Sequence, residues 1–491
     1  MIRTKSQLIA LLSLCAFGAA LCGERAGAEP SSAAQQVPLR PFVTCVEALP
    51  DGRLRAHWGY LNASRSPLQR KLGSTNQLSP GAAERGQPTQ FKVGYVVDAF
   101  SSVFAADATS TWTLDDVRAS ADKHGHRCSA EQISADPASL VNPAPGSPLF
   151  LGANLWNIDW QEQSDYFVAQ PDWSRAQNPW QPQFLRELAP YHVLRFMDWN
   201  LTNDADNPQS RWTTRKQRNQ AQNEPVAFEW QIDLCNLAKK DYWVNVPHAA
   251  NPAYITQLAL LIRDQLSPQL RVYVEWSNEI WNGSFPQREY ARVKAQQLGL
   301  PGDDPAAAYQ VYASLRAFDA FDAVFGKARN RIVKVIAGQA AYSGPCQAHT
   351  AALADPKINP QRKQPDVYAV APYFHGTSLS DLSGQGIEEA RAGVIDNLRC
   401  AKGLSVPLIA YEGGQDSFAA GHDGCRELQQ NPALRAIYVK FLDAVASAGL
   451  RGPFMQYTHT GSCWGLKEKT SDSLDASPKY KGVLDWLAAH P

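Results

Sequence analysis

The sequence carries no excess of charge of either sign. Its 491 residues include 47 Lys and Arg against 47 Asp and Glu, interspersed along the chain. A protein that binds nucleic acid presents a concentrated basic surface, and this composition indicates none. Charged residues make up only 19% of the chain, whereas 14 Trp, 17 Tyr and 18 Phe supply ample material for a core. Global disorder is therefore excluded.

Long apolar runs are absent beyond the N-terminus, since none after residue 28 approaches the 18 residues of a membrane span. The apolar run Leu8–Leu21 follows the basic residues Arg3 and Lys5 and precedes Ala26–Ala28, an A-x-A cleavage signal. We therefore predict a signal peptide over residues 1–28 and a secreted or periplasmic, bacterial protein without a membrane span. A membrane anchor is the weaker alternative.

No C-x-x-C pair occurs, which argues against a cysteine metal site, and we expect neither a metal nor a cofactor. Of nine cysteines, Cys15 and Cys22 belong to the predicted signal peptide. In an oxidising compartment the others default to disulfides. Cys45 and Cys128 bracket one segment and are expected to join its ends. The working assignment for the rest, one of several that the spacing allows, is Cys346 with Cys400, Cys425 with Cys463, and Cys235 as a buried thiol.

The remaining chain divides by pattern into two parts and a linker. Residues 41–128 contain short strand-like runs separated by turn residues such as Asp51-Gly52, which is typical of a small all-β sandwich. For this module a carbohydrate-binding role and a structural spacer are both open. Residues 129–148 are rich in Pro, Ala and Ser, which predicts a linker.

From residue 149 to 491, apolar runs of strand length alternate with helical stretches. Eight buried strands alternating with helices predict a (β/α)8 barrel, although a doubly wound sheet alternates in the same way. The glycines at 421 and 424 predict a turn around Asp423. The eight runs are 150–155, 193–197, 242–246, 272–275, 332–337, 367–371, 408–411 and 453–457. The helical stretches include 253–265, 288–297, 306–325 and 432–448.

Polar and aromatic residues follow these runs where the strands end, and in such barrels the chemistry lies at the carboxyl ends of the strands. Glu279 follows the fourth run within W-S-N-E-I-W-N, and Glu412 follows the seventh within Y-E-G-G-Q. The two glutamates are therefore expected to face each other across the barrel mouth. Glycoside hydrolysis needs such a pair, one carboxylic acid to protonate the leaving oxygen and one carboxylate to attack or to activate water.

On these motifs the segment 149–491 resembles the clan A glycoside hydrolases, the group that contains the cellulase-like family 5. The resemblance implies Glu279 as the acid/base and Glu412 as the nucleophile of a retaining mechanism acting on β-glycosidic bonds. Their carboxyl groups are then expected ~5–5.5 Å apart. The pKa of Glu279 is expected to be raised by the charge of Glu412 and by partial burial.

The resemblance also implies binding roles for further strand-end residues. Arg195 would keep the nucleophile ionised, Asn278 would bind the sugar 2-hydroxyl, and Tyr373 would hydrogen-bond the nucleophile. Trp464 would form the floor of the −1 subsite, and His248 matches the histidine of the third strand. The remaining candidate substrate contacts are Trp156, Trp281 and His375.

One departure concerns family 5 itself. Its members tend to carry a His two residues before the Tyr of the sixth strand, whereas here Ala371 occupies that place and His375 comes two residues after Tyr373. The amino-acid sequences of the two glutamate motifs more closely resemble those of a subgroup of bacterial secreted relatives.

Two other function classes are alternatives to glycoside hydrolysis. A carbohydrate-binding or adhesion protein would keep the barrel as a lectin-like cleft, but the intact glutamate pair argues against it. An esterase or zinc hydrolase is disfavoured because neither G-x-S-x-G nor H-E-x-x-H occurs. Arg211, Arg215 and Arg218 either recognise an acidic glycan or lie in solvent. We predict a monomeric secreted glycosidase acting on a polysaccharide or oligosaccharide.

Overall fold

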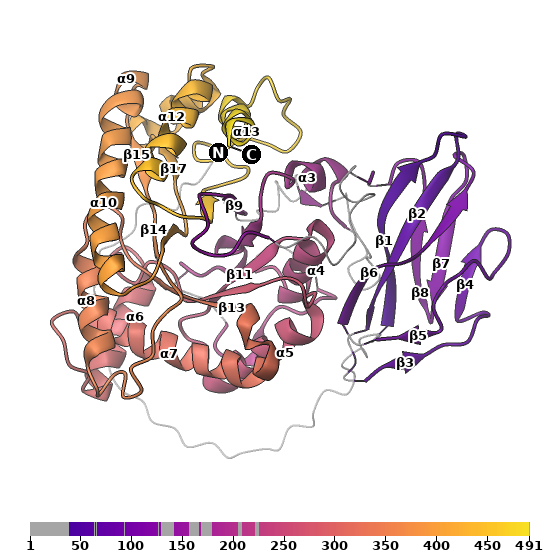
Figure 1. Ribbon diagram of the computed structural model, residues 1–491, viewed down its shortest axis with the longest axis horizontal. Coiled ribbons are helices and arrows are strands. Elements are labelled where there is room, and N and C mark those ends of the chain that lie inside the picture. The colour runs from indigo at the N-terminus through magenta and orange to yellow at the C-terminus, as the bar shows by residue number, and fades with distance from the viewer. Residues whose placement is uncertain are drawn as a thin grey trace, which may run out of the picture. The chain divides into compact units, whose positions relative to one another are not determined.

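A computed structural model describes residues 39–62, 64, 66–92, 94–125, 127–128, 142–156, 166–167, 179–204, 209–220 and 225–490. The predicted signal peptide and residues 129–141 of the predicted linker lie outside these ranges. The described chain contains a group of small antiparallel sheets and a closed barrel with flanking helices (Figure 1). Within the described ranges, no helix is both long enough and apolar enough to cross a membrane.

The N-terminal part is all β, as predicted. Side chains from its two three-stranded sheets, Trp58 from one and Trp112 from the other, belong to a single apolar core. The predicted Cys45–Cys128 disulfide joins the ends of this part. The first sheet consists of β1 (Leu39–Ala48), β2 (Leu54–Asn62) and β6 (Gly94–Phe104). The second consists of β4 (Asn76–Ser79), β7 (Ser110–Leu114) and β8 (Val117–Ala121). A small two-stranded sheet is formed by β3 (Leu68–Gln69) and β5 (Gln90–Phe91).

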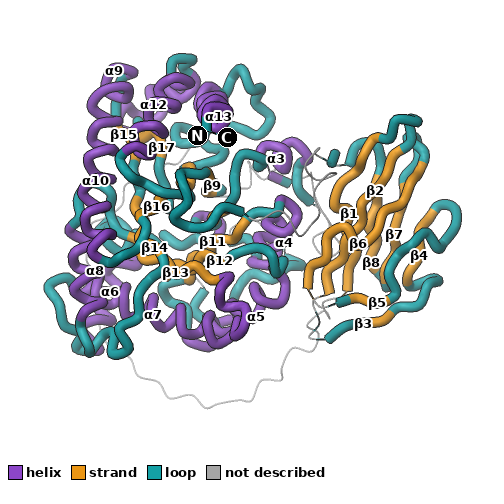
Figure 2. The backbone as a smooth tube through the Cα atoms, viewed as in Figure 1, coloured by secondary structure: helices purple, strands orange, loops and turns teal. Residues whose placement is uncertain are grey.

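Eight parallel strands close into a barrel (Figure 2). Each overlaps one of the eight predicted runs, and pairing of the last strand with the first confirms the barrel over the doubly wound sheet. In spatial order the strands are β9 (Leu151–Asn154), β10 (Val193–Arg195), β11 (Asp241–Val246), β12 (Val272–Trp276), β13 (Ile332–Ala337), β14 (Val367–Val370), β16 (Leu408–Ala410) and β18 (Phe454–Gln456).

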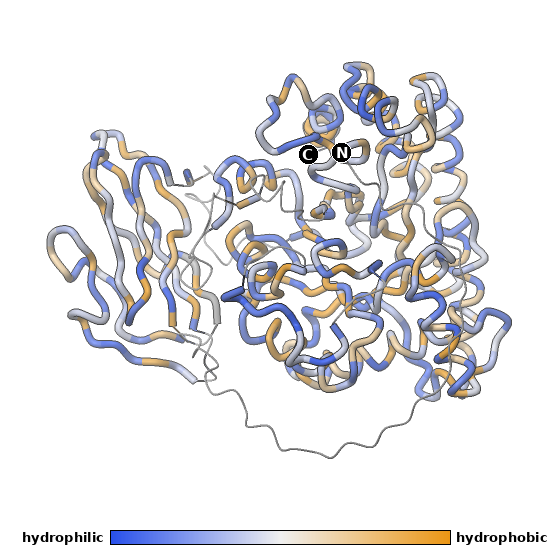
Figure 3. Tube along the Cα trace, turned by 180° about the vertical axis from the view of Figure 1, so that it is seen from behind, coloured by the Kyte–Doolittle hydropathy of each residue, from blue (hydrophilic) through white to orange (hydrophobic). Residues whose placement is uncertain are grey.

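The four predicted helical stretches correspond to α5 (Pro252–Gln265), α6 (Pro286–Leu298), α7 (Pro305–Phe325) and α12 (Leu434–Ser447). The first three begin with proline, whose fixed φ suits the first helical position. Figure 3 shows hydrophilic and hydrophobic segments alternating along the coiled parts of the chain, as expected for helices with one buried face. Other helices are α3 (Pro182–Glu187), α4 (Phe228–Ala238), α8 (Gly344–Ala354), α9 (Leu379–Asp381), α10 (Ile387–Gly403) and α13 (Pro478–Ala489).

The turn predicted around Asp423 is wrong. Helix α11 (Gly421–Gln430) begins there, and Asp423 lies in its first turn, where the helix dipole favours a negative charge. The other cysteine assignments are confirmed. The Cys346–Cys400 disulfide links α8 to α10, Cys425 of α11 pairs with Cys463, and Cys235 is a buried free thiol.

The barrel interior is filled by side chains rather than left as a pore. Trp243 and Tyr273 stack there with their ring centroids 5.1 Å apart. Gly152 is required on β9, because a Cβ at that position would lie 2.3 Å from the Met455 sulfur. Toward the carboxyl ends of the strands the interior becomes polar and holds the fully buried Arg195. This polar layer lies beneath the candidate site.

Candidate active site

The carboxyl ends of β12 and β16 bring the two predicted glutamates to one cavity. Glu279 and Glu412 both line a cavity of about 870 Å³, and both are almost completely buried. Five of the predicted substrate contacts also line it, namely Asn278, Trp281, Tyr373, His375 and Trp464. The remaining three, Arg195, His248 and Trp156, are not among its described lining residues.

Arg195 is the centre of a buried hydrogen-bond network. Its guanidinium donates to Oε1 of Glu412 at 2.8 Å and to Oε2 of Glu275 at 2.9 and 3.2 Å. It also donates to the side-chain oxygens of Asn154 at 2.9 Å and Asn278 at 2.8 Å. These bonds occupy all five N–H donors of the side chain. Arg195 therefore acts by positioning Glu412 and Asn278 from below rather than by lining the cavity.

Glu412 is held by direct charge-assisted contacts. Tyr373 donates its hydroxyl to Oε2 at 2.9 Å, while Arg195 occupies Oε1. Burial raises the pKa of Glu412, and the Arg195 cation and the Tyr373 hydroxyl oppose this because they favour the charged form. A cation is bonded directly to Glu412 and not to Glu279, so the contacts favour the charged form more at Glu412 than at Glu279.

Glu279 leaves strand β12 through an unusual backbone turn. Its φ is +41°, and that of Ser277 is +61°, both in the left-handed region that non-glycine residues rarely adopt. The side chain is fixed by two donors, the Tyr411 hydroxyl at 2.9 Å on Oε1 and the Asn282 amide at 2.9 Å on Oε2. The Trp281 indole donates to the Tyr411 oxygen at 3.3 Å, so the tyrosine proton is free to point at Glu279.

The electrostatic surroundings of Glu279 differ from those of Glu412. Burial raises the pKa of Glu279 and the neighbouring charge of Glu412 raises it further, while Asn282, Tyr411 and Arg195 only partly offset this. The predicted direction of the shift is confirmed. A carboxyl whose surroundings favour the protonated form therefore lies beside one that is bonded to a cation.

An extra pair of short strands extends the wall of the cavity. β15 (Tyr373–His375) pairs in parallel with β17 (Gly414–Asp416), just beyond the ends of β14 and β16. Gly413 allows this path, because a Cβ there would lie 2.6 Å from the Phe454 ring and 3.0 Å from the Pro372 carbonyl oxygen.

The strand pair places His375 beside Asp416, with Nδ1 and Oδ2 3.3 Å apart. This contact is the main cause that raises the pKa of His375. Burial raises the pKa of Asp416, but His375, the Phe418 N–H and the Trp464 indole outweigh burial and lower it. The cavity wall therefore carries an acid–histidine pair next to Trp464.

Several residues of the site were not predicted, among them Glu275, Tyr411 and Tyr457. The period-two alternation of the strands contains a signal for the first two. Ile409 points into the barrel interior, so Tyr411, two residues further along the same apolar run, is expected to point the same way. Tyr273 likewise points into the interior, which predicts the same direction for Glu275. Glu275 also accepts hydrogen bonds from Trp243 and Asn245. Tyr457 lines the cavity directly after β18, with its ring centroid 6.1 Å from that of Tyr373.

His248 and Trp156 are not among the described lining residues of the cavity. His248 is buried with its ring against Tyr290, and burial lowers its pKa. Trp156 stacks on Trp464 with centroids 5.7 Å apart and an interplanar angle of 17°. A direct contact of either residue with substrate remains a prediction.

Two of the three arginines of the insert 200–228 interact with protein groups. Arg215 forms a bidentate pair with Glu229 at 2.6 and 2.9 Å, and its guanidinium lies 4.1 Å from the centre of the Trp212 ring. Arg218 pairs with Asp233 at 2.5 Å. Neither these two nor Arg211 is among the described lining residues of the cavity. In the described ranges, no group of three His, Cys, Asp or Glu side chains is arranged to hold a metal ion.

No family model and no curated protein matches the chain. Among solved structures, it is similar to a 4-O-α-L-rhamnosyl-β-D-glucuronidase from Fusarium oxysporum 12S (14% identity, 72% of this chain and 71% of that chain, TM-score 0.41). It is also similar to a GH51 arabinofuranosidase from Xanthomonas axonopodis pv. citri (11%, 67% and 70%, TM-score 0.44). A third is a modular endo-β-1,4-mannanase from Cellulomonas fimi (12%, 70% and 71%, TM-score 0.41). These neighbours are glycoside hydrolases, and the similarity is too low to transfer a residue role or a substrate.

Proposed function

We propose that the protein is a retaining glycoside hydrolase that cleaves β-glycosidic bonds of a polysaccharide or oligosaccharide. The observation that carries the proposal is the pair of carboxyls in one cavity with opposite environments. Glu412 is hydrogen-bonded to the Arg195 cation. Glu279 accepts its described hydrogen bonds from the neutral side chains of Asn282 and Tyr411, and it lies beside the negative charge of Glu412. One pair of groups then supplies both an ionised nucleophile and a protonated acid.

In the first step Glu412 attacks the anomeric carbon and forms a glycosyl–enzyme ester. The glycosidic C–O bond breaks, and Glu279 transfers its proton to the departing oxygen. In the second step Glu279, now a carboxylate, takes a proton from water as the water oxygen attacks the anomeric carbon. The ester bond to Glu412 breaks, and the anomeric configuration is retained. Tyr373 and Arg195 stabilise the Glu412 carboxylate when it departs.

The cavity and the disulfides support the other parts of the proposal. A volume of about 870 Å³ lies within the range of ~300–1,000 Å³ usual for ligand sites. Three disulfides favour an extracellular or periplasmic location, because such bonds persist in oxidising compartments. The domain boundaries proposed from sequence are a signal peptide at 1–28, a β module at 41–128, a linker at 129–148 and a catalytic barrel at 149–491.

The test is a screen of the protein from residue 29 onward on polysaccharides and aryl glycosides, with Glu412→Gln and Glu279→Gln. We expect the turnover of each variant on natural glycosidic linkages to fall by ~10²–10⁴-fold. The matched control is Glu388→Gln, an exposed glutamate of α10 that pairs with Arg391, and it should retain full activity. Product analysis by NMR should show the retained anomer first.

Each alternative result has a distinct meaning. Wild-type activity in either glutamine variant would contradict the catalytic assignments, and an inverted product would contradict the nucleophilic role of Glu412. Tight glycan binding without cleavage would instead favour a carbohydrate-binding protein built on a hydrolase-like barrel.

A further inference from the structure

Phe418 is an exposed aromatic side chain stacked on a residue of the cavity wall. Its ring centroid lies 5.3 Å from that of Trp464, with 19° between the planes. Even so, 58% of Phe418 is exposed, because the stack leaves the other face and edge of the ring to solvent. Trp464 itself lines the cavity that contains Glu279 and Glu412. Because one face of Phe418 stacks on Trp464, its other face is the aromatic surface that remains open to a ligand beside the cavity.

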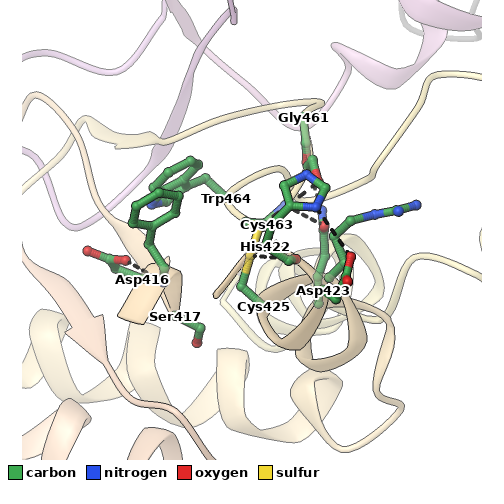
Figure 4. Close-up of a disulfide and its surroundings, with 12 residues drawn as sticks. Asp416, Ser417, His422, Asp423, Cys425, Gly461, Cys463 and Trp464 are labelled. Carbon is green, nitrogen blue, oxygen red and sulfur yellow. Dashed lines mark hydrogen bonds and ion pairs between the residues drawn. A yellow bond between two sulfur atoms is a disulfide. The ribbon is translucent and has the colours of Figure 1, made fainter. Parts of the chain in front are cut away.

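The loop that carries Trp464 is fastened from α11. Cys463 is joined to Cys425, and its N–H donates to Oε1 of Gln429 at 2.7 Å. The Gln429 amide donates in turn to the carbonyl oxygens of Gly461 at 2.9 Å and Gly465 at 2.8 Å. Figure 4 shows the disulfide directly beside Trp464.

A second helix fastens the same loop from beneath. Lys479 of α13 is completely buried, and its Nζ donates to the carbonyl oxygens of Cys463 at 3.0 Å and Trp464 at 3.2 Å. On the other side of the stack, Asp416 accepts the Phe418 N–H at 3.0 Å. A surface held in this way loses little conformational freedom on binding, which favours affinity.

Exposed aromatic rings of this kind suit a particular ligand chemistry. One face of a pyranose ring presents C–H groups, and these pack on the electron-rich face of an aromatic side chain. An isolated exposed aromatic needs no explanation, but this one continues the wall of a cavity and is rigidly supported. A single sugar bound at the glutamate pair would not need a platform at the rim, whereas a longer glycan chain would.

We infer that the free face of Phe418, supported from behind by Trp464, forms an outer subsite that stacks on a neutral pyranose residue of a glycan chain whose scissile bond lies at the glutamate pair. The inference rests on the proposed function for the position of that bond. It assigns Trp464 to the support of this outer platform in place of the predicted floor of the −1 subsite.

The experiment compares Phe418→Ala with Leu298→Ala, a control at an exposed apolar residue near the end of α6. Each variant is built in the Glu412→Gln protein, and retention is measured by electrophoresis through gels that contain neutral β-glucan, xylan or mannan. We expect Phe418→Ala to weaken retention about tenfold on the polymer that binds. Leu298→Ala and the conservative Phe418→Tyr should retain it.

Equal retention of Phe418→Ala and the parent, or retention of the parent by none of the three polymers, would overturn the subsite. In the catalytically intact protein, Phe418→Ala should lower kcat/KM about tenfold on that polymer and leave it unchanged on a one-sugar aryl glycoside. An equal loss on both substrates would also contradict the inference. If the polymer binds but is never cleaved, the proposed function fails while the platform stands.

Discussion

Tyr411 donates a hydrogen bond from its hydroxyl to Oε1 of Glu279 at 2.9 Å, although it precedes Glu412 in the chain. Its ring also lies over the guanidinium of Arg195, 5.2 Å from the ring centre to Cζ. One side chain thus contacts both Glu279 and the cation that is bonded to Glu412. Tyr411 therefore connects the position of Glu279 to that of Arg195 and, through Arg195, to that of Glu412.

Replacing Tyr411 by Phe should shift the high-pH limb of the rate profile upward. The lost hydrogen bond stabilises the carboxylate form of Glu279, so its removal raises the pKa of Glu279 still further. A general acid is active while protonated, and activity falls as pH rises through its pKa, so a raised pKa moves that fall to higher pH. Hydrogen bonds to charged groups contribute ~1.5–3 kcal/mol, which corresponds to a shift of roughly one pH unit or more.

The measurement is kcat/KM against pH on an aryl glycoside. The control is Tyr368→Phe, which removes the hydroxyl of another buried barrel tyrosine, one that contacts His349 and is not among the described cavity lining. A uniform loss at every pH in Tyr411→Phe, or the same profile in both variants, would show that Tyr411 only supports the fold.

Much of this site was accessible from the sequence because strand ends are marked by a change in composition. The eight apolar runs located the barrel strands, and Glu279 and Glu412 followed from their places at two strand ends. Tyr411 was not predicted as a site residue because it belongs to the apolar run 408–411, where an aromatic residue first suggests packing in the core. Its function depends on a contact with a residue 132 positions away, which spacing does not encode.

His248 and Trp156 illustrate the opposite difficulty. Both follow predicted strand runs, but order along the chain does not determine which way a side chain points. His248 turns toward Tyr290, and Trp156 stacks on Trp464. The helix at Asp423 was missed because glycines suggest turns, although packing against neighbouring elements outweighs that local preference.

Replacing Arg195 by Met should both destabilise the protein and shift the low-pH limb upward. It leaves the buried carboxylates of Glu275 and Glu412 without their cation, which costs ~3–5 kcal/mol of unfolding free energy. Loss of the cation raises the pKa of Glu412, and because the nucleophile must be ionised, activity then begins at higher pH. Urea unfolding and the pH profile measure the two effects.

Arg195→Lys separates the charge from the geometry. Lysine keeps a positive charge but lacks the five-donor fork, so we expect an intermediate loss of stability and a smaller shift. Arg435→Met removes an exposed pair with Asp485 and should change little. Wild-type stability in Arg195→Met would contradict the network described here.

The cysteine pattern predicts one free thiol in the chain from residue 29 onward. Native protein should take up no alkylating label, because Cys235 is completely buried and the other six cysteines of that chain are paired. Unfolding in urea without reductant should expose one labelled cysteine, which peptide mass spectrometry should place at Cys235. Label at Cys425 or Cys463 before reduction would contradict the disulfide that fastens the Trp464 loop.

Neutral glycans should be better substrates than uronates. Among its described lining residues the cavity has the carboxyls of Glu389, Asp396 and Asp416 besides Glu279 and Glu412, with His375 as the basic group and no Lys or Arg. A uronate would approach like charges, so we expect kcat/KM at least about tenfold lower for an aryl uronide than for its neutral counterpart at pH 7, with the gap narrowing as salt rises. Arg211→Ala should leave both values unchanged, since Arg211 is not among those lining residues. A preference for the uronide that disappears in Arg211→Ala would instead show that the insert arginines recognise an acidic glycan.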